Sequence, residues 1–151
     1  MTIDVPAGPG TDPNWLLGGL VDRVPGARCA VLLSADGLVI AEHGLGRDAA
    51  DLMAPLAAGL CGIARTIGAT FGGDGVRQVV AELDAALVSV SSAGYGSVLA
   101  VLAGREADAG VLGYEMTQLV KSVAPFLAAR PRRRGMVTHG EGNARRMTDP
   151  R

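Results

Sequence analysis

Few side chains in this sequence have the type and spacing that catalysis needs. The two histidines, His43 and His139, lie far apart, one at the end of a predicted strand and one near the C-terminus. This separation argues against a shared metal site or a histidine-based triad. Glu42 beside His43 suggests an ion pair at a strand end, and Asp48 and Asp51 fall at a helix start, where carboxylates meet the helix dipole favourably. We therefore predict no catalytic residue, no cofactor-binding residue and no metal ligand.

Two glycine clusters have the composition of phosphate-binding loops but not their pattern. A P-loop needs the spacing GxxxxGK[ST], with a lysine on the phosphates and a helix directly behind the loop. Residues 72–75 (Gly-Gly-Asp-Gly) contain no lysine and precede a predicted strand, and residues 94–96 (Gly-Tyr-Gly) have the same defect. Both clusters are interpreted as turns.

Composition excludes several classes of protein. Hydrophobic residues make up 48% of the 151 residues, which is typical of a folded chain with an aliphatic core, whereas aromatics at 3% argue against stacking platforms for nucleic acid or sugars. Cys29 and Cys61 form neither a disulfide framework nor a metal motif, so we expect free thiols in a reducing compartment. No signal peptide and no apolar run of about 20 residues are recognised, which predicts a cytoplasmic protein without direct membrane insertion.

Charge and Pro/Gly content divide the chain into three predicted parts. Residues 1–11 are rich in proline and glycine and are expected to be disordered. Residues 12–129 form one domain, and residues 130–151 form a basic tail. The net charge is −6 over residues 1–129 and +5 over the tail. The tail is interpreted as a disordered extension; attachment to nucleic acid, an acidic membrane or an acidic partner is the alternative.

Residue periodicity predicts helix, two strands, helix, three strands and helix. Asp12 is predicted to cap the first helix, with Pro13 as the first helical residue. Asp108 is predicted to cap the last helix. The strands fall at about 29–34, 38–41, 76–83, 86–92 and 97–102, joined by tight turns that imply an antiparallel sheet. The fold class is therefore α+β.

The central helix, about residues 48–71, has two apolar stripes that together cover roughly 200° of its circumference, twice what a surface helix needs. One stripe can pack on the sheet, and the other requires a further partner. A symmetric homodimer explains it economically; cover by another helix of the same chain is the alternative. Pro55 is expected to bend this helix or delay its start. The large-residue stripe is Leu52, Leu56, Leu60, Ile63, Ile67 and Phe71, and the second stripe is Met53, Ala57, Cys61, Ala64 and Gly68.

Four segments in register resemble Roadblock/dynein light chain domains, and most closely the bacterial conservon-type proteins found beside a small Ras-like GTPase and a sensor-kinase-like protein. They are residues 30–38, 56–60, 75–83 and 109–116. The resemblance implies a profilin-like sandwich with a five-stranded antiparallel sheet between helices. It also implies a homodimer in which the central helix and the following strand pair with their symmetry mates. The interface candidates implied are Leu52, Met53, Leu56, Ala57, Leu60, Ala64, Arg77, Gln78 and Val79.

The resemblance implies a function in regulating a small Ras-like GTPase, as a non-enzymatic, cytoplasmic adaptor that reaches the membrane only through partners such as a sensor-kinase-like protein. A GTPase-activating protein is one alternative. One route to activation inserts an arginine into the GTPase site, and Arg47, Arg65 and Arg77 are the candidates, with Arg47 and Arg65 as candidate GTPase contacts. A small-ligand sensor of profilin-like fold is the second alternative.

Overall fold

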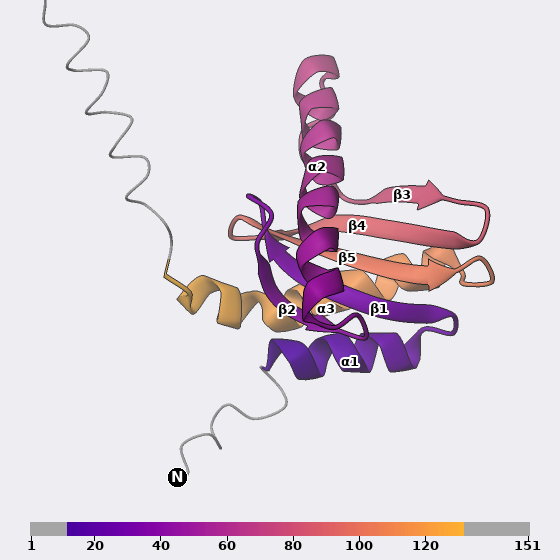
Figure 1. Cartoon of the computed structure of the whole chain (residues 1–151). Coiled ribbons are helices and arrows are strands. Elements are labelled where there is room, and N and C mark those ends of the chain that lie inside the picture. Colours follow the sequence, from indigo (N-terminus) through magenta and orange to yellow (C-terminus); the bar gives the residue numbers. More distant parts are fainter. Residues whose placement is uncertain (1–11, 132–151) are drawn as a thin grey trace, which may run out of the picture.

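A computed structural model describes residues 12–131 and contains three helices and one five-stranded sheet (Figure 1). The predicted segment 1–11 and nearly all of the predicted tail 130–151 lie outside the described residues. The order agrees with the sequence prediction. The elements are α1 (Pro13–Arg23), β1 (Ala27–Ser34), β2 (Val39–His43), α2 (Arg47–Phe71), β3 (Val79–Glu82), β4 (Ala86–Gly94), β5 (Ser97–Gly104) and α3 (Ala109–Ala129).

The sheet has the strand order β2-β1-β5-β4-β3, and every neighbouring pair is antiparallel. β2 and β3 are therefore the two edges. Helices α1 and α3 cover one face and α2 crosses the other (Figure 1). This confirms the predicted α+β sandwich with a five-stranded antiparallel sheet between helices.

Helix caps form where the sequence predicts them. The carboxylate of Asp12 accepts a hydrogen bond from the backbone N–H of Asn14, with Pro13 as the first helical residue. The carboxylate of Asp108 accepts from the N–H groups of Gly110 and Val111. Such caps satisfy backbone donors that have no partner within the helix.

The face covered by α1 and α3 is packed with large aliphatic side chains. Leu32 of β1 and Leu99 of β5 lie beneath helix residues that are completely buried. An ion pair of 2.9 Å between Arg23 Nε and Glu115 Oε1 joins the two helices. The helix residues in this core are Leu17, Leu20, Leu112, Met116, Leu119, Val123 and Leu127.

The face covered by α2 has a thinner core. The strands contribute Val31, Leu33, Val90 and Val98. Helix α2 contributes four small residues that are completely buried, Ala50, Ala54, Ala57 and Cys61. These small residues recur at helical spacing along one side of α2. The helix can therefore lie close to the sheet without filling the space with large side chains.

Pro55 does not delay the start of α2, which begins at Arg47 and continues through the proline to Phe71. Its pyrrolidine removes the hydrogen bond that residue 55 would otherwise donate to the carbonyl of Asp51. The side chain is exposed, and the tip of the β1–β2 hairpin lies against it at Gly37, where an added Cβ would come within 3.2 Å of the Pro55 Cα.

Candidate partner-binding surface

The largest apolar side chains of α2 point away from the domain. Leu52, Leu56, Ile63, Ile67 and Phe71 are between 55% and 81% exposed. At 100° per residue they lie within about 100° of one another on the helix, next to the stripe of small residues that packs on the sheet. We call these five residues the α2 ridge. An exposed row of this kind marks an interaction surface.

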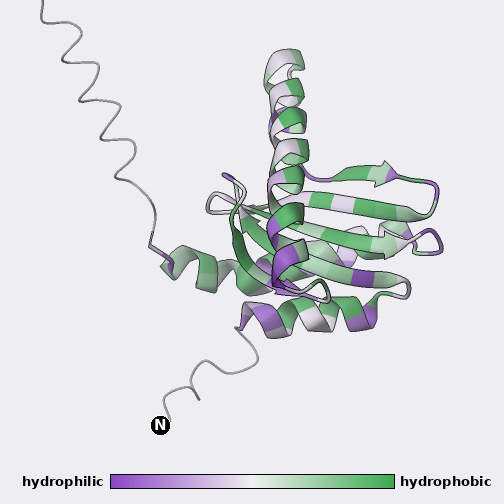
Figure 2. Ribbon diagram, viewed as in Figure 1, coloured by the Kyte–Doolittle hydropathy of each residue, from purple (hydrophilic) through white to green (hydrophobic). Residues whose placement is uncertain are grey.

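The second half of α2 extends beyond the sheet. Its buried residues end at Cys61, and none of the ten residues that follow is buried. Figure 1 shows these turns projecting past β3, and Figure 2 shows that apolar residues continue along the projecting part. This part of the helix has no core of its own beneath it, so its apolar residues remain in contact with water unless a partner covers them.

β3 is the edge strand past which α2 projects, and it has open backbone groups (Figure 1). The N–H of Leu83 donates to the carbonyl of Ala86 at 2.8 Å, which makes these two residues a hydrogen-bonded pair across the β3–β4 turn. Hydrogen-bonded and non-bonded pairs alternate in antiparallel strands. Val80 and Glu82 therefore direct their N–H and C=O groups away from β4, toward the open side, and an uncovered edge of this kind is a template for another strand.

The structure separates most of the predicted interface residues into three groups. Ala57 is completely buried against the chain's own sheet, and Val79 packs beside the same core, so these two support the fold. Leu52 and Leu56 belong to the ridge. Met53, Leu60 and Ala64 are partly buried between the ridge and the sheet.

Gln78 has a structural role that the sequence did not indicate. Its Nε2 donates to the buried Ser89 Oγ at 2.7 Å, and Gly113 of α3 leaves room for it, since a Cβ there would lie 3.0 Å from that amide nitrogen. This bond fixes the chain just before β3, which runs only from Val79 to Glu82 instead of 76–83.

The interface predicted from the sequence lacks three of the five ridge residues. Ile63, Ile67 and Phe71 belong to the predicted large-residue stripe but were not among the interface candidates. The i, i+4 spacing already contained that signal. The open backbone groups of Val80 and Glu82 have no signal in residue type, because they follow from the pairing of β3 with β4.

The three candidate arginines are not brought together. Arg47 begins α2, and its Nε lies 3.9 Å from Asp51 Oδ2 in an exposed pair. Arg65 is on the projecting part of the helix, where its Nη2 lies 3.5 Å from Cys61 Sγ. Arg77 is exposed just before β3. They lie on different segments of the α2 and β3 side, so the geometry favours no single arginine.

Other candidate chemistry is sparse in residues 12–131. They hold no group of three His, Cys, Asp or Glu side chains with metal-binding geometry. Cys29 and Cys61 are free and buried, and burial raises the pKa of the Cys29 thiol, which keeps it protonated. The predicted Glu42–His43 ion pair is wrong: Glu42 Oε1 instead accepts from the N–H groups of Leu45 and Gly46, and so holds the entry to α2.

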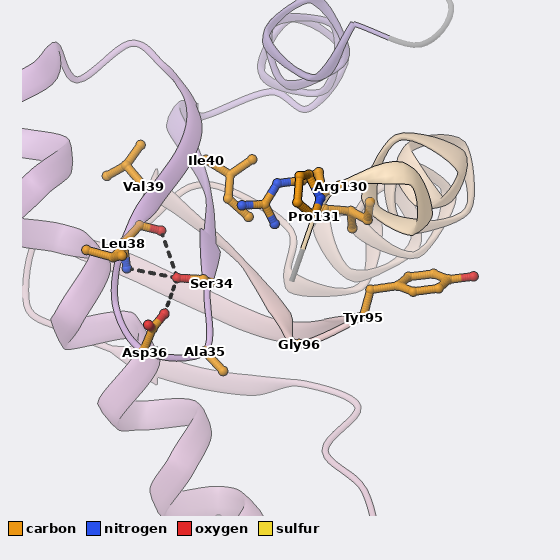
Figure 3. A pocket seen from close by; sticks show the side chains of 11 residues that line it. Ser34, Ala35, Asp36, Leu38, Val39, Ile40, Tyr95, Gly96, Arg130 and Pro131 are labelled. Atoms are coloured by element: carbon orange, nitrogen blue, oxygen red, sulfur yellow. Dashed lines mark hydrogen bonds between the residues drawn. The ribbon is translucent and has the colours of Figure 1, made fainter. Parts of the chain in front are cut away.

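An open groove of about 400 Å³ lies between the β1–β2 hairpin and the end of α3 (Figure 3). Within the groove, the Ser34 hydroxyl donates a hydrogen bond to Asp36 and accepts one from the backbone N–H of Leu38. Arg130 also lines the groove, from the end of α3. Tyr95 stands at the rim with a left-handed backbone, φ 56°. The groove is open along its length and contains no cluster of groups typical of catalysis.

Helix α2 is long and apolar enough to cross a membrane, judged by length and composition alone, and it is the one such helix in the described part of the chain. The expectation that no apolar run approaches the length of a membrane span is therefore wrong when length and mean hydropathy are the criteria. Helix α2 meets both criteria because alanines and glycines, which carry no charge, fill the positions between the ridge residues. In this fold, its first half packs on a sheet through small residues.

The chain matches the Roadblock/LC7 domain over residues 13–103, which include α1, the helix with the ridge, and all but the last residue of the sheet. The protein belongs to the Roadblock/LC7 family. The expected resemblance is thereby confirmed. No curated protein sequence gives a significant match.

Solved structures agree with this assignment. A Roadblock/LC7 domain from Streptomyces avermitilis is 61% identical, with a TM-score of 0.76, over 79% of this chain and 100% of that one. MglB from Myxococcus xanthus is 15% identical, with a TM-score of 0.69, over 78% and 96% of the two chains. Profilin IA from Acanthamoeba castellanii is 14% identical, with a TM-score of 0.54, over 76% and 98%. The last two share the fold, which confirms the profilin-like description.

Proposed function

We propose that this Roadblock/LC7 protein is a non-enzymatic, dimeric adaptor that regulates a small Ras-like GTPase in a bacterial signalling system. The observation that supports the proposal most directly is the α2 ridge, which lies exposed beside the open β3 edge. Both features need a protein partner, and neither offers a group for chemistry.

A second copy of the chain fits both features at once. If β3 pairs with β3 of a partner about a two-fold axis perpendicular to the sheet, the sheet continues through both copies and both α2 helices lie on the same side. The projecting half of each helix then lies over the neighbouring copy. The large side chains of the ridge lose contact with water, at about 25 cal/mol for each Å² of apolar surface buried. Isologous contacts of this kind are typical of homodimers.

The small GTPase is proposed from the Roadblock assignment. The sequence resembles conservon-type proteins. In a signalling system of that kind, such a dimer would link a membrane sensor-kinase-like protein to the GTPase. We propose a cytoplasmic location with membrane contact through that partner. The separated positions of Arg47, Arg65 and Arg77 favour an adaptor over a protein that inserts one arginine into the GTPase site.

Single-turnover GTP hydrolysis by the small GTPase encoded nearest this gene tests the proposal. The chain is titrated from well below to well above the GTPase concentration, and complex formation is followed in parallel. We expect binding without acceleration. Faster hydrolysis at substoichiometric amounts would instead identify an activating protein, and alanine variants of Arg47, Arg65 and Arg77 would then locate its source. Absence of binding in both nucleotide states would refute the GTPase assignment.

A further inference from the structure

We propose that, in the homodimer, the end of α2 from one copy packs on the sheet of the other, on a row of apolar residues beside that copy's own α2. Ile67 and Phe71 of the ridge are the side chains that make this contact. The inference rests on the proposed homodimer and names the surface that receives its projecting helices.

One row of apolar side chains on the α2 face lies beside the helix. Ala81 of β3 pairs with Val88 of β4, and Val88 pairs with Leu102 of β5. Two residues away on each strand lies a second row, which packs under α2 and consists of Val79, Val90 and Ala100. Residues two apart in a strand point to the same face. Ala81, Val88 and Leu102 therefore face the same side of the sheet as α2.

This row stays partly open to water in a single copy. Leu102 is partly exposed and lies outside both cores. Leu83 follows β3, donates its N–H to the carbonyl of Ala86 at the end of the hairpin, and is 54% exposed. By the same alternation it also faces the α2 side. We call Ala81, Leu83, Val88 and Leu102 the side row.

The ridge of α2 points toward the side row. In Figure 1, β3, β4 and β5 continue to the right of α2, in the direction of the arrowhead of β3. The buried stripe of α2 faces the sheet, and at 100° per residue the ridge lies about 125° from that stripe. Because the helix is right-handed and runs upward in this view, the ridge points to the right and outward. Leu52 and Leu56, in the first half of the ridge, therefore border the side row of their own copy.

The projecting part of α2 has the length needed to cross the partner's side row. Residues 62–71 extend for about 15 Å at 1.5 Å per residue. Neighbouring strands lie about 4.8 Å apart, so crossing β3, β4 and β5 of the other copy takes about 14 Å. The two-fold axis makes the two α2 helices antiparallel. The projecting part of one helix therefore lies beside the first half of the other, above the side row.

Ile67 and Phe71 are the projecting side chains that can make this contact. The side of the helix that continues the buried stripe is closed at Gly68, where an added Cβ would meet the carbonyl oxygen of Asp74 in the same chain. Phe71 lies about 80° from Cys61 around the helix, and Ile67 about 120°. They are 81% and 55% exposed. Packing on the side row would remove both from water, which is favourable for apolar surface.

A charge exchange between two variants tests the proposal by sedimentation velocity of the full chain. Ile67→Glu alters the projecting helix, and Leu83→Lys alters the side row. We expect each variant alone to dissociate at least ~10-fold more readily than wild type, because each places a charge in an apolar contact. An equimolar mixture should form a heterodimer about 10-fold tighter than either variant alone. One of its two contacts is native, and the other pairs the introduced carboxylate with the introduced ammonium group.

Val80→Lys is the matched control, because Val80 is an exposed apolar residue of β3 that alternation directs to the α3 face. All three substituted side chains are at least 40% exposed, so the monomer fold should be kept, and circular dichroism checks this. If Leu83→Lys dimerises as tightly as wild type, the packing is refuted while the dimer stands. The same holds if Ile67→Glu binds Leu83→Lys no more tightly than it binds Val80→Lys. A monomeric wild type refutes both the dimer and this inference.

Discussion

The two faces of the sheet differ in where they place their large side chains. On the α1 and α3 face, the large aliphatic residues point inward and are completely buried. On the α2 face, alanines and a cysteine point inward, and the five ridge residues point outward. One face is therefore completed within the chain, whereas the other has its main apolar surface on the outside. This asymmetry distinguishes a core that stabilises the monomer from a surface that is built for a partner.

The largest effect is expected in the completed core. Leu112→Ala removes a side chain that is fully buried between α3 and the sheet, so the free energy of unfolding should fall by about 2–5 kcal/mol. Urea denaturation at two protein concentrations measures this loss and separates it from dimerisation. Leu56→Ala is the matched variant on the ridge. An equal, concentration-independent loss in both variants would contradict the distinction between the two faces.

A smaller loss is expected where α2 lies close to the sheet. Ala57→Leu adds three carbons at a position with no exposed surface, and such overpacking costs about 1–3 kcal/mol. Thermal denaturation should show a lower midpoint, while Ala69→Leu, at an exposed position of the same helix, serves as the control. If Ala57→Leu is tolerated as well as the control, α2 is not held closely against the sheet.

The ridge should affect assembly and leave the monomer fold intact. Ile63→Glu with Ile67→Glu places two carboxylates on the projecting half of α2, and dimer dissociation should increase by more than ~10-fold because the charges would lose water in the interface. Sedimentation reports assembly, and circular dichroism reports the unchanged helix content. Ala69→Glu is the charge control on the same helix. Dimers that persist in the double variant would show that the ridge is not covered by the second copy.

The smallest effect is expected at Tyr95, which lies on neither face. Its φ of 56° is strained for a tyrosine, whereas asparagine tolerates this conformation. Tyr95→Asn should therefore stabilise the domain by about 0.5–1 kcal/mol, measured as a higher midpoint of thermal unfolding. Tyr95→Phe keeps the strain and should show no gain. A lower midpoint for Tyr95→Asn would mean that ring contacts in the groove outweigh the strain.

Local signals in the sequence were sufficient for most of the fold. Asp12 and Asp108 have the residue type and position of helix caps, and both act as such. The α2 stripes were also visible, but periodicity cannot tell which one packs on the sheet. That choice depends on how closely the helix approaches, and here the small residues allow the closer contact.

Features that depend on tertiary contacts were less accessible from sequence. β3 was predicted too long, because Gln78 looks like a strand residue until its bond to Ser89 is known. Glu42 was paired with its neighbour His43, whereas the turn that follows offers it two N–H groups. The start of α2 ahead of Pro55 likewise reflects the helix's packing on the sheet, which outweighs the local cost of the proline.

Sedimentation equilibrium of the wild-type chain over a wide range of concentrations tests the central claim most directly. If the ridge and the β3 edge are completed by a second copy, the protein should have twice the monomer mass at micromolar concentrations and dissociate only on strong dilution. A single species of monomer mass up to about 100 μM, where even weak dimers with Kd values in the micromolar range assemble, would contradict it.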